Sequence, residues 1–246
     1  NTDGSVKSTV EIDDTTTNGP TLSNNDRFGT SIADIGDLDG DGVDDLAVGA
    51  HFDDECGSCG HDNPNRGAVH IMFMNTDGSV DSTVEINSST TNGPSLEDSD
   101  TMGSSIANIG DLDGDGVDDL AVGAINDSVA GLGGGNRGAV HIMFMKDAIK
   151  PTVTITSSSG DSGDTTSSTT LSYTATFSES TSNFVVGDIT VTGTANDGSP
   201  EASNFAGSGT TYTFDVVQGS SDGTVSVSVA AGVATDAAGN DNTVSN

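Results

Sequence analysis

The chain has 246 residues, of which six are basic and 38 are acidic, and its formal net charge at pH 7 is −32. This charge excludes nucleic acid and anionic membranes as expected partners, and no apolar run has the length of a transmembrane helix. The length suits two domains, while scarce aromatic residues and abundant Gly, Ser, Thr and Asp indicate an all-β fold with tight turns. The chain begins with Asn1 rather than Met, so we expect a mature product or a piece of a longer protein.

The first part of the chain contains a duplicated unit. Residues 1–6 recur at 75–80 with an offset of 74, and residues 65–74 recur at 136–145 with an offset of 71. The difference of three residues falls in a polar loop that contains Cys56 and Cys59. A fixed repeat whose variation lies in one loop is typical of a duplicated supersecondary structure.

Four strands are predicted in each unit, and in the first they cover residues 28–35, 45–50, 67–74 and 82–86. The third strand is apolar on both faces, so we expect both faces to be covered, as in a blade packed between neighbours. One face carries Val69, Ile71 and Phe73, and the other carries Ala68, His70, Met72 and Met74.

Between the first two strands lies a nine-residue acidic loop, residues 37–45, which recurs unchanged at 111–119. Carboxylates stand at positions 1, 3, 5 and 9, a glycine at position 6 permits a sharp turn, and the carbonyl at position 7 adds an oxygen. An all-oxygen donor set suits Ca²⁺. A strand follows the loop, so an EF-hand is excluded, and a simple Asp/Gly-rich turn is the alternative. The predicted ligands of the two calcium sites are Asp37, Asp39, Asp41, Val43 and Asp45, and Asp111, Asp113, Asp115, Val117 and Asp119.

The two cysteines, Cys56 and Cys59, are predicted to form a short local disulfide, because the expected location is extracellular. A metal site that also uses His51, His61 or Asp53 is one alternative. A thioredoxin-like redox role is another, but no βαβ pattern surrounds the motif.

These units resemble the FG-GAP repeat of integrin α subunits and of many microbial surface proteins. The resemblance lies in Phe28-Gly29, the acidic loop, residues 46–50 and residues 67–73, and it covers about 28–86 and 102–145. It implies one four-stranded propeller-type blade per repeat, with calcium in the loop. The chain departs from the pattern at Met102-Gly103, which replaces Phe-Gly, and at His51, where the family often has Pro.

Integrin-like propellers have seven blades, whereas this chain has two. Residues 8–12 are predicted to be a fourth strand with no blade before it, and after Met145 the second blade lacks its fourth strand. Three hypotheses follow. Residues 8–12 add to the second blade of their own chain as its fourth strand, they add to the second blade of another copy, or the chain is cut from a longer array.

From Pro151 onward, apolar residues alternate with polar ones over short strands, which indicates a β-sandwich. The segments 184–191, 209–214 and 233–240 resemble bacterial Ig-like modules, and the resemblance covers residues 151–246. Such modules often act as spacers, some with calcium near their junctions. For Asp188 and Asp236 we expect turn formation, with calcium binding as the alternative.

We therefore predict two domains: residues 1–147 with two FG-GAP repeats, and residues 148–246 with an Ig-like β-sandwich. No nucleophile with a base and no catalytic motif is evident, so no catalytic residue is assigned and an enzyme is not expected. The leading hypothesis is an extracellular or cell-surface calcium-binding structural or adhesion protein that self-associates by β-strand exchange. The alternative is a receptor-like binding module for glycan or protein ligands, with residues 51–64 and 125–135 as the contact surface.

Overall fold

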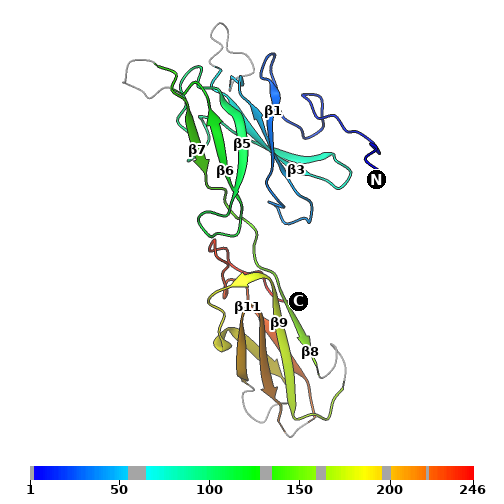
Figure 1. Cartoon of the computed structure of the whole chain (residues 1–246). Coiled ribbons are helices and arrows are strands. Elements are labelled where there is room, and N and C mark those ends of the chain that lie inside the picture. The colour runs from blue at the N-terminus through cyan, green and yellow to red at the C-terminus, as the bar shows by residue number, and fades with distance from the viewer. Residues whose placement is uncertain (1–2, 55–64, 128–134, 159–164, 196–200, 220–221) are drawn as a thin grey trace. The chain divides into compact units, whose positions relative to one another are not determined.

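Figure 1 shows a computed structural model of the chain, which describes residues 3–54, 65–127, 135–158, 165–195, 201–219 and 222–246. The chain divides into two compact units: Asn1–Asp113 with Val117–Lys146, and Gly114–Gly116 with Asp147–Asn246. In the described residues every regular element is a β-strand except one 3-10 turn, η1 (Val186–Asp188). The predicted all-β class is therefore confirmed.

The first repeat forms a four-stranded antiparallel sheet whose strands follow chain order. Its strands are β1 (Phe28–Asp34), β2 (Leu46–Ala50), β3 (Ala68–Met74) and β4 (Val80–Ile86). A tight turn joins β3 to β4: the Asn75 amide donates to the Ser79 carbonyl at 2.9 Å, and Gly78 takes a φ of +85°. Glycine adopts this left-handed conformation without steric cost, so the hairpin closes over few residues.

Both faces of β3 are covered, as its sequence predicts. Every residue of the strand is buried except Phe73, which is half-buried. Val69 and Ile71 belong to a core shared with the second repeat, whereas Met72 and Met74 belong to a separate cluster on the other face. Each face of β3 therefore contributes to a different hydrophobic cluster.

The second repeat forms a sheet of three strands, β5 (Met102–Gly110), β6 (Asp119–Ala124) and β7 (Ala139–Met143). No fourth strand follows β7 among the described residues, as the strand count from the sequence predicts. This blade thus has one strand fewer than the four that the family resemblance implies.

The prediction of a strand at residues 8–12 is wrong. These residues have no ladder hydrogen bonds in the structure, and Val10 is 55% exposed. Ile12 packs against the first blade, beside Val48 and Met72. β4 already occupies the edge of β3, and a strand-like sequence without a partner does not form a strand.

The two blades pack closely because glycines stand where they meet. Gly67 bridges to Met102, and the Ser31 hydroxyl donates to the carbonyl of Gly103 at 2.7 Å. A Cβ on Gly49 would lie 2.0 Å from that same carbonyl oxygen. The shared core contains Ile35, Ala47, Val69, Ile71, Leu96, Met102, Leu120, Val122 and Ala124.

The second unit contains two facing sheets, as expected for an Ig-like sandwich. One sheet has the order β11-β9-β8 and the other pairs β10 with β12. The strands are β8 (Val153–Ser157), β9 (Thr170–Thr181), β10 (Ile189–Gly193), β11 (Ala202–Val217) and β12 (Val225–Val229). The core comes from alternate strand residues such as Ala175, Phe214 and Val229. The Tyr212 hydroxyl donates to the Thr181 carbonyl at 2.9 Å.

Within the part of the chain that the structure describes, no helix has the length and hydropathy needed to span a membrane.

Candidate metal centres in the acidic loops

The first acidic loop is held at its base by the β1–β2 ladder. Asp34 pairs with Leu46 at the end of the two strands. Beyond them the Ile35 amide donates to the Asp45 carbonyl at 3.0 Å, and the Asp45 amide donates to the Gly36 carbonyl at 2.7 Å. Ile35 itself is buried in the core shared by the blades. These contacts fix the two ends of the loop at the edge of the sheet.

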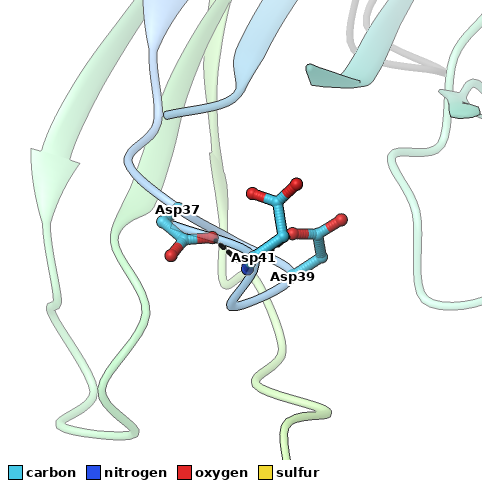
Figure 2. A group of neighbouring side chains, drawn as sticks. All are labelled: Asp37, Asp39 and Asp41. Atoms are coloured by element: carbon cyan, nitrogen blue, oxygen red, sulfur yellow. Dashed lines mark hydrogen bonds between the residues drawn. The ribbon is translucent and has the colours of Figure 1, made fainter. Parts of the chain in front are cut away.

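Inside the loop, carboxylates organise the backbone. Asp37 accepts three hydrogen bonds, from the amides of Gly40 at 2.8 Å, Asp41 at 3.0 Å and Gly42 at 2.8 Å. Asp39 accepts a second bond from the Asp41 amide at 3.2 Å. Figure 2 shows Asp37, Asp39 and Asp41 around this tight turn, with the bonds to the Asp41 amide drawn. The turn thus places three side chains from alternate residues on one site.

The oxygen atoms of these three carboxylates can meet on one ion. One oxygen from each of Asp37, Asp39 and Asp41 lies within 4.8 Å of the others, and all three residues are exposed. The donors are hard anionic oxygens without sulfur or imidazole, which fits calcium and similar cations. A bound cation would also relieve the mutual repulsion of the carboxylates.

Asp45, the fourth predicted carboxylate, does not join this group. It is 1% exposed, and both of its oxygens accept backbone hydrogen bonds: Oδ2 from the Leu38 amide and Oδ1 from the Met74 amide, each at 2.9 Å. Burial raises the pKa of Asp45, the two amides act in the opposite direction, and the charges of Asp39 and Asp37 raise it further. Asp45 therefore ties the loop to the end of β3.

Val43 donates its amide to Asp41 Oδ1 at 2.8 Å. The role of its carbonyl as a ligand stays a prediction, as does that of Val117.

The second loop repeats the same arrangement. Oxygens of Asp111, Asp113 and Asp115 also lie within 4.8 Å of one another. Asp119 is fully buried, and its carboxylate accepts hydrogen bonds from the amides of Leu112 and Met145, each at 2.9 Å. Each loop thus has three clustered carboxylates and one aspartate that serves as a structural anchor.

The predicted disulfide lies outside the described residues, since Cys56 and Cys59 fall in the segment 55–64, together with His61. His51 and Asp53, the other candidates for a metal site with these cysteines, lie beside Thr30 and His70 respectively. His51 Nδ1 lies 2.8 Å from the Thr30 hydroxyl, and Asp53 Oδ2 lies 3.6 Å from His70 Nε2.

The histidines of β3 and β7 lie beside aspartates, and these Asp–His pairs repeat in both blades. His141 Nε2 lies 3.2 Å from Asp127 Oδ2, in the position that corresponds to Asp53 and His70. His70 is fully buried and meets the Phe28 ring edge-on, with centroids 5.5 Å apart. The sequence does not identify these aspartate partners, because they are remote from the histidines in the chain.

A third group of carboxylates, Asp147, Glu179 and Asp236, lies in the second unit. Sequence reasoning missed it, because its members are far apart in the chain and form no motif. Of its members, the sequence offers only Asp236 as a candidate ligand. The other candidate in this unit is Asp188, whose carboxylate accepts a hydrogen bond from the Val185 amide at 2.8 Å.

Two protein-family models match segments of this chain. The FG-GAP repeat model matches residues 28–72 and 102–143, and the model of a bacterial Ig-like domain matches residues 147–246.

Among individual proteins, the chain is 44% identical over 102 residues to integrin alpha-5 of Xenopus laevis, which is 40% of this chain and 8% of the relative. It is 33% identical over 103 residues to integrin alpha-PS5 of Drosophila melanogaster, covering 42% of this chain and 9% of the relative. It is also 31% identical over 107 residues to integrin alpha-2 of Mus musculus, covering 44% and 8%. The chain therefore spans less than a tenth of the length of these relatives.

Proposed function

We infer that this protein is an extracellular, adhesion-type module that binds calcium through its two acidic loops. Its sequence matches two FG-GAP repeats followed by a bacterial Ig-like domain. The observation that carries this proposal is the convergence of three carboxylates at the same loop position in both repeats. The families involved are typically non-enzymatic, and no catalytic role is proposed.

Calcium would act on this protein by linkage. An ion that binds the ordered loop but not the unfolded chain stabilises the fold, and the stabilisation grows with its concentration. Two Ca²⁺ ions would add four positive charges, which brings the net charge from −32 to −28. The ligands proposed for each ion are the three clustered aspartates, with the carbonyl of Val43 or Val117.

Equilibrium dialysis with calcium tests this role, with Asp39→Asn and Asp113→Asn as loop variants. Each substitution should remove about one bound calcium and reduce the rise in unfolding temperature that calcium causes. Asp44→Asn is the matched control, because Asp44 is an exposed aspartate of the same loop outside the cluster. Unchanged calcium binding by both loop variants would contradict the proposal.

Within this function we propose that copies of the chain associate head to tail. The trailing face of the second blade supports this idea. Val140 is 66% exposed, Ile142 is 45% exposed and Phe144 is 57% exposed. The equivalent residues of the first blade, Val69 and Ile71, are 0% and 2% exposed because the second blade covers them. The same side chains are thus buried when a blade follows.

The leading face of the first blade offers the matching surface. Ile32 is 61% exposed, whereas its equivalent in the second repeat, Ile106, packs against the shared core. Gly29 takes a φ of +84° like Gly103, and a Cβ on it would meet no atom within 4 Å. A second copy would therefore dock as the second blade docks on the first.

Strand exchange would complete the contact. Residues 6–12 differ from β4 only by Lys7 in place of Asp81, yet they join no sheet of the described residues. Among the strands that the structure describes, β7 pairs only with β6, whereas β3 in the first blade pairs with β2 and β4. We propose that residues 6–12 of one copy add to β7 of another, as β4 adds to β3.

Sedimentation velocity in millimolar calcium, and then with chelator, tests the association. We expect rings or filaments with calcium that dissociate on chelation. Val140→Glu should prevent assembly, and Val217→Glu should not, because Val217 is a similarly exposed strand valine of the other unit, at 56% against 66% for Val140. A wild-type monomer in both conditions would overturn the association and leave the calcium proposal intact.

A second candidate is a receptor-like module that binds a protein or glycan ligand. The likeness to integrin alpha chains favours it. Its proposed contact loops fall largely in residues 55–64 and 128–134, outside the described residues. Saturable binding by the monomer that is lost on exchange of these loops would favour this candidate over assembly.

A further inference from the structure

Three segments of the second unit bring carboxylates to one place. Asp147 precedes β8, Glu179 lies near the end of β9, and Asp236 lies beyond β12 in a turn closed by the bridge between Thr235 and Asp241. One oxygen from each of the three lies within 4.8 Å of the others. Unlike the acidic loops, this group assembles only when the sandwich folds.

The group is withdrawn from solvent. Asp147 is 4% exposed, Asp236 is 6% exposed and Glu179 is half-buried. No lysine or arginine of the described residues pairs with any of them. Buried anions without a counter-charge are costly, because the low dielectric interior does not solvate them.

Two of the oxygen atoms also lack any hydrogen-bond donor. Glu179 Oε1 and Asp236 Oδ2 are both buried without a partner in the described structure. This differs from Asp45, where both buried oxygens accept backbone amides. A buried carboxylate oxygen without a donor has a position suited to a bound cation.

The backbone orients the two aspartates toward this position. The Ile149 amide donates to Asp147 Oδ1 at 2.7 Å, and the Asn240 amide donates to Asp236 Oδ1 at 2.8 Å. In Asp236 this bond leaves Oδ2 as the unpaired atom within the group. Burial raises the pKa of Asp147 and of Glu179, and the charge of a neighbouring carboxylate raises each further.

We propose that Asp147, Glu179 and Asp236 form a third calcium site within the Ig-like unit, built from carboxylates other than those of the two loops. The donors are carboxylate oxygens only, which favours Ca²⁺ over zinc or copper. A divalent cation would supply the missing partner for both unpaired oxygens and cancel two of the three negative charges. The site would join the start of β8, β9 and the turn after β12, so it would stabilise the sandwich itself.

Calcium stoichiometry of the full chain separates this site from the loops. We expect three ions per wild-type chain, two in Glu179→Gln, and one in the double variant Asp39→Asn/Asp113→Asn. If the loops do not bind but this site does, the wild type would bind one ion, which Glu179→Gln would remove. Glu201→Gln is the matched control, because Glu201 is exposed in the same unit.

Terbium luminescence gives a second readout. The chain has no tryptophan and only two tyrosines, Tyr173 and Tyr212, both in the second unit. In the double loop variant, excitation of tyrosine should still sensitise Tb³⁺, and calcium should displace it. Adding Glu179→Gln or Asp236→Asn should abolish the signal.

Unfolding in chelator distinguishes a metal ligand from a structural residue. Removing a charge from a repelling group should leave the calcium-free sandwich as stable as before or more stable, and should abolish its stabilisation by calcium. Asp236→Asn serves as a second variant if Glu179→Gln does not fold. Unchanged calcium counts and retained terbium emission in the folded variants would overturn the proposal.

Discussion

Asp45 and Met74 connect the first acidic loop to the far end of β3, since Asp45 Oδ1 accepts a hydrogen bond from the Met74 amide at 2.9 Å. The second blade repeats this connection between Asp119 and Met145, also at 2.9 Å. In each blade the last aspartate of the acidic loop thus links two neighbouring strands. Its position at the end of the loop, which is the same in both repeats, therefore serves the sheet.

We predict that Asp45→Asn destabilises the first blade even without calcium. The amide group keeps one acceptor oxygen, so either the Leu38 or the Met74 amide loses its partner, which costs about 1–3 kcal/mol. Removal of a buried charge offsets part of this loss. Urea unfolding in chelator should show a net decrease, whereas the exposed control Asp44→Asn should unfold like wild type. Equal stability of Asp45→Asn and wild type would contradict this role.

A matched pair of glycines tests the packing of the blades. We expect Gly49→Ala to cost about 1–3 kcal/mol of unfolding free energy, because the new Cβ would lie 2.0 Å from the Gly103 carbonyl oxygen. The equivalent Gly123→Ala meets only serine hydroxyls, 2.4 Å away at Ser105, which can rotate. Thermal unfolding of the monomer should therefore show a larger decrease for Gly49→Ala. Equal decreases would contradict the close approach.

The burial of Asp26 should make the stability of the fold depend on pH. Asp26 is 3% exposed, and its Oδ1 has no hydrogen-bond partner among the described residues. Burial raises its pKa, the Ser23 amide acts in the opposite direction, and the charge of Asp53 raises it further. The folded protein then binds this proton more tightly than the unfolded chain does. Its contribution to stability is complete below the ordinary aspartate pKa of about 3.9 and is lost as pH rises through the folded value.

The stability of wild type relative to Asp26→Asn should therefore fall as the pH rises above about 4. Urea unfolding of both proteins at a series of pH values measures this difference. A difference that stays constant or grows with pH would contradict the assignment.

Added salt should reproduce part of the stabilisation that calcium gives to the fold. With 38 acidic and six basic residues, the folded chain repels itself, and the Debye length falls from about 30 Å at 0.01 M salt to about 3 Å at 1 M. In chelator, added NaCl should raise the unfolding temperature. In saturating calcium the same addition should raise it less. An equal rise in both conditions would indicate that calcium does not relieve the repulsion.

The features that the sequence predicts well are those encoded locally. The acidic loops follow from the spacing of Asp37, Asp39 and Asp41, and the burial of β3 follows from apolar residues on both of its faces. Residues 8–12 show the limit of such reasoning. They have the same sequence as residues 82–86 of β4 but form no strand, because a strand depends on a partner that the local sequence does not specify.

Features built from distant residues were not predictable from spacing. The group of Asp147, Glu179 and Asp236 exists only because three segments of the sandwich meet. The anchor role of Asp45 depends on the Met74 amide, which belongs to another strand. A motif identifies which residues can bind an ion, but the tertiary fold decides which of them are already engaged.

The turn between β3 and β4 also bears on folding kinetics. Two nearly identical segments, residues 6–12 and β4, compete for the same edge of β3 during folding. The hairpin closed by Asn75 and Ser79 needs a short loop, and loop-closure entropy favours it over the distant segment by roughly 2 kcal/mol. The turn, rather than any side chain of β4, thus selects the native partner of β3, and it leaves the N-terminal segment outside that sheet.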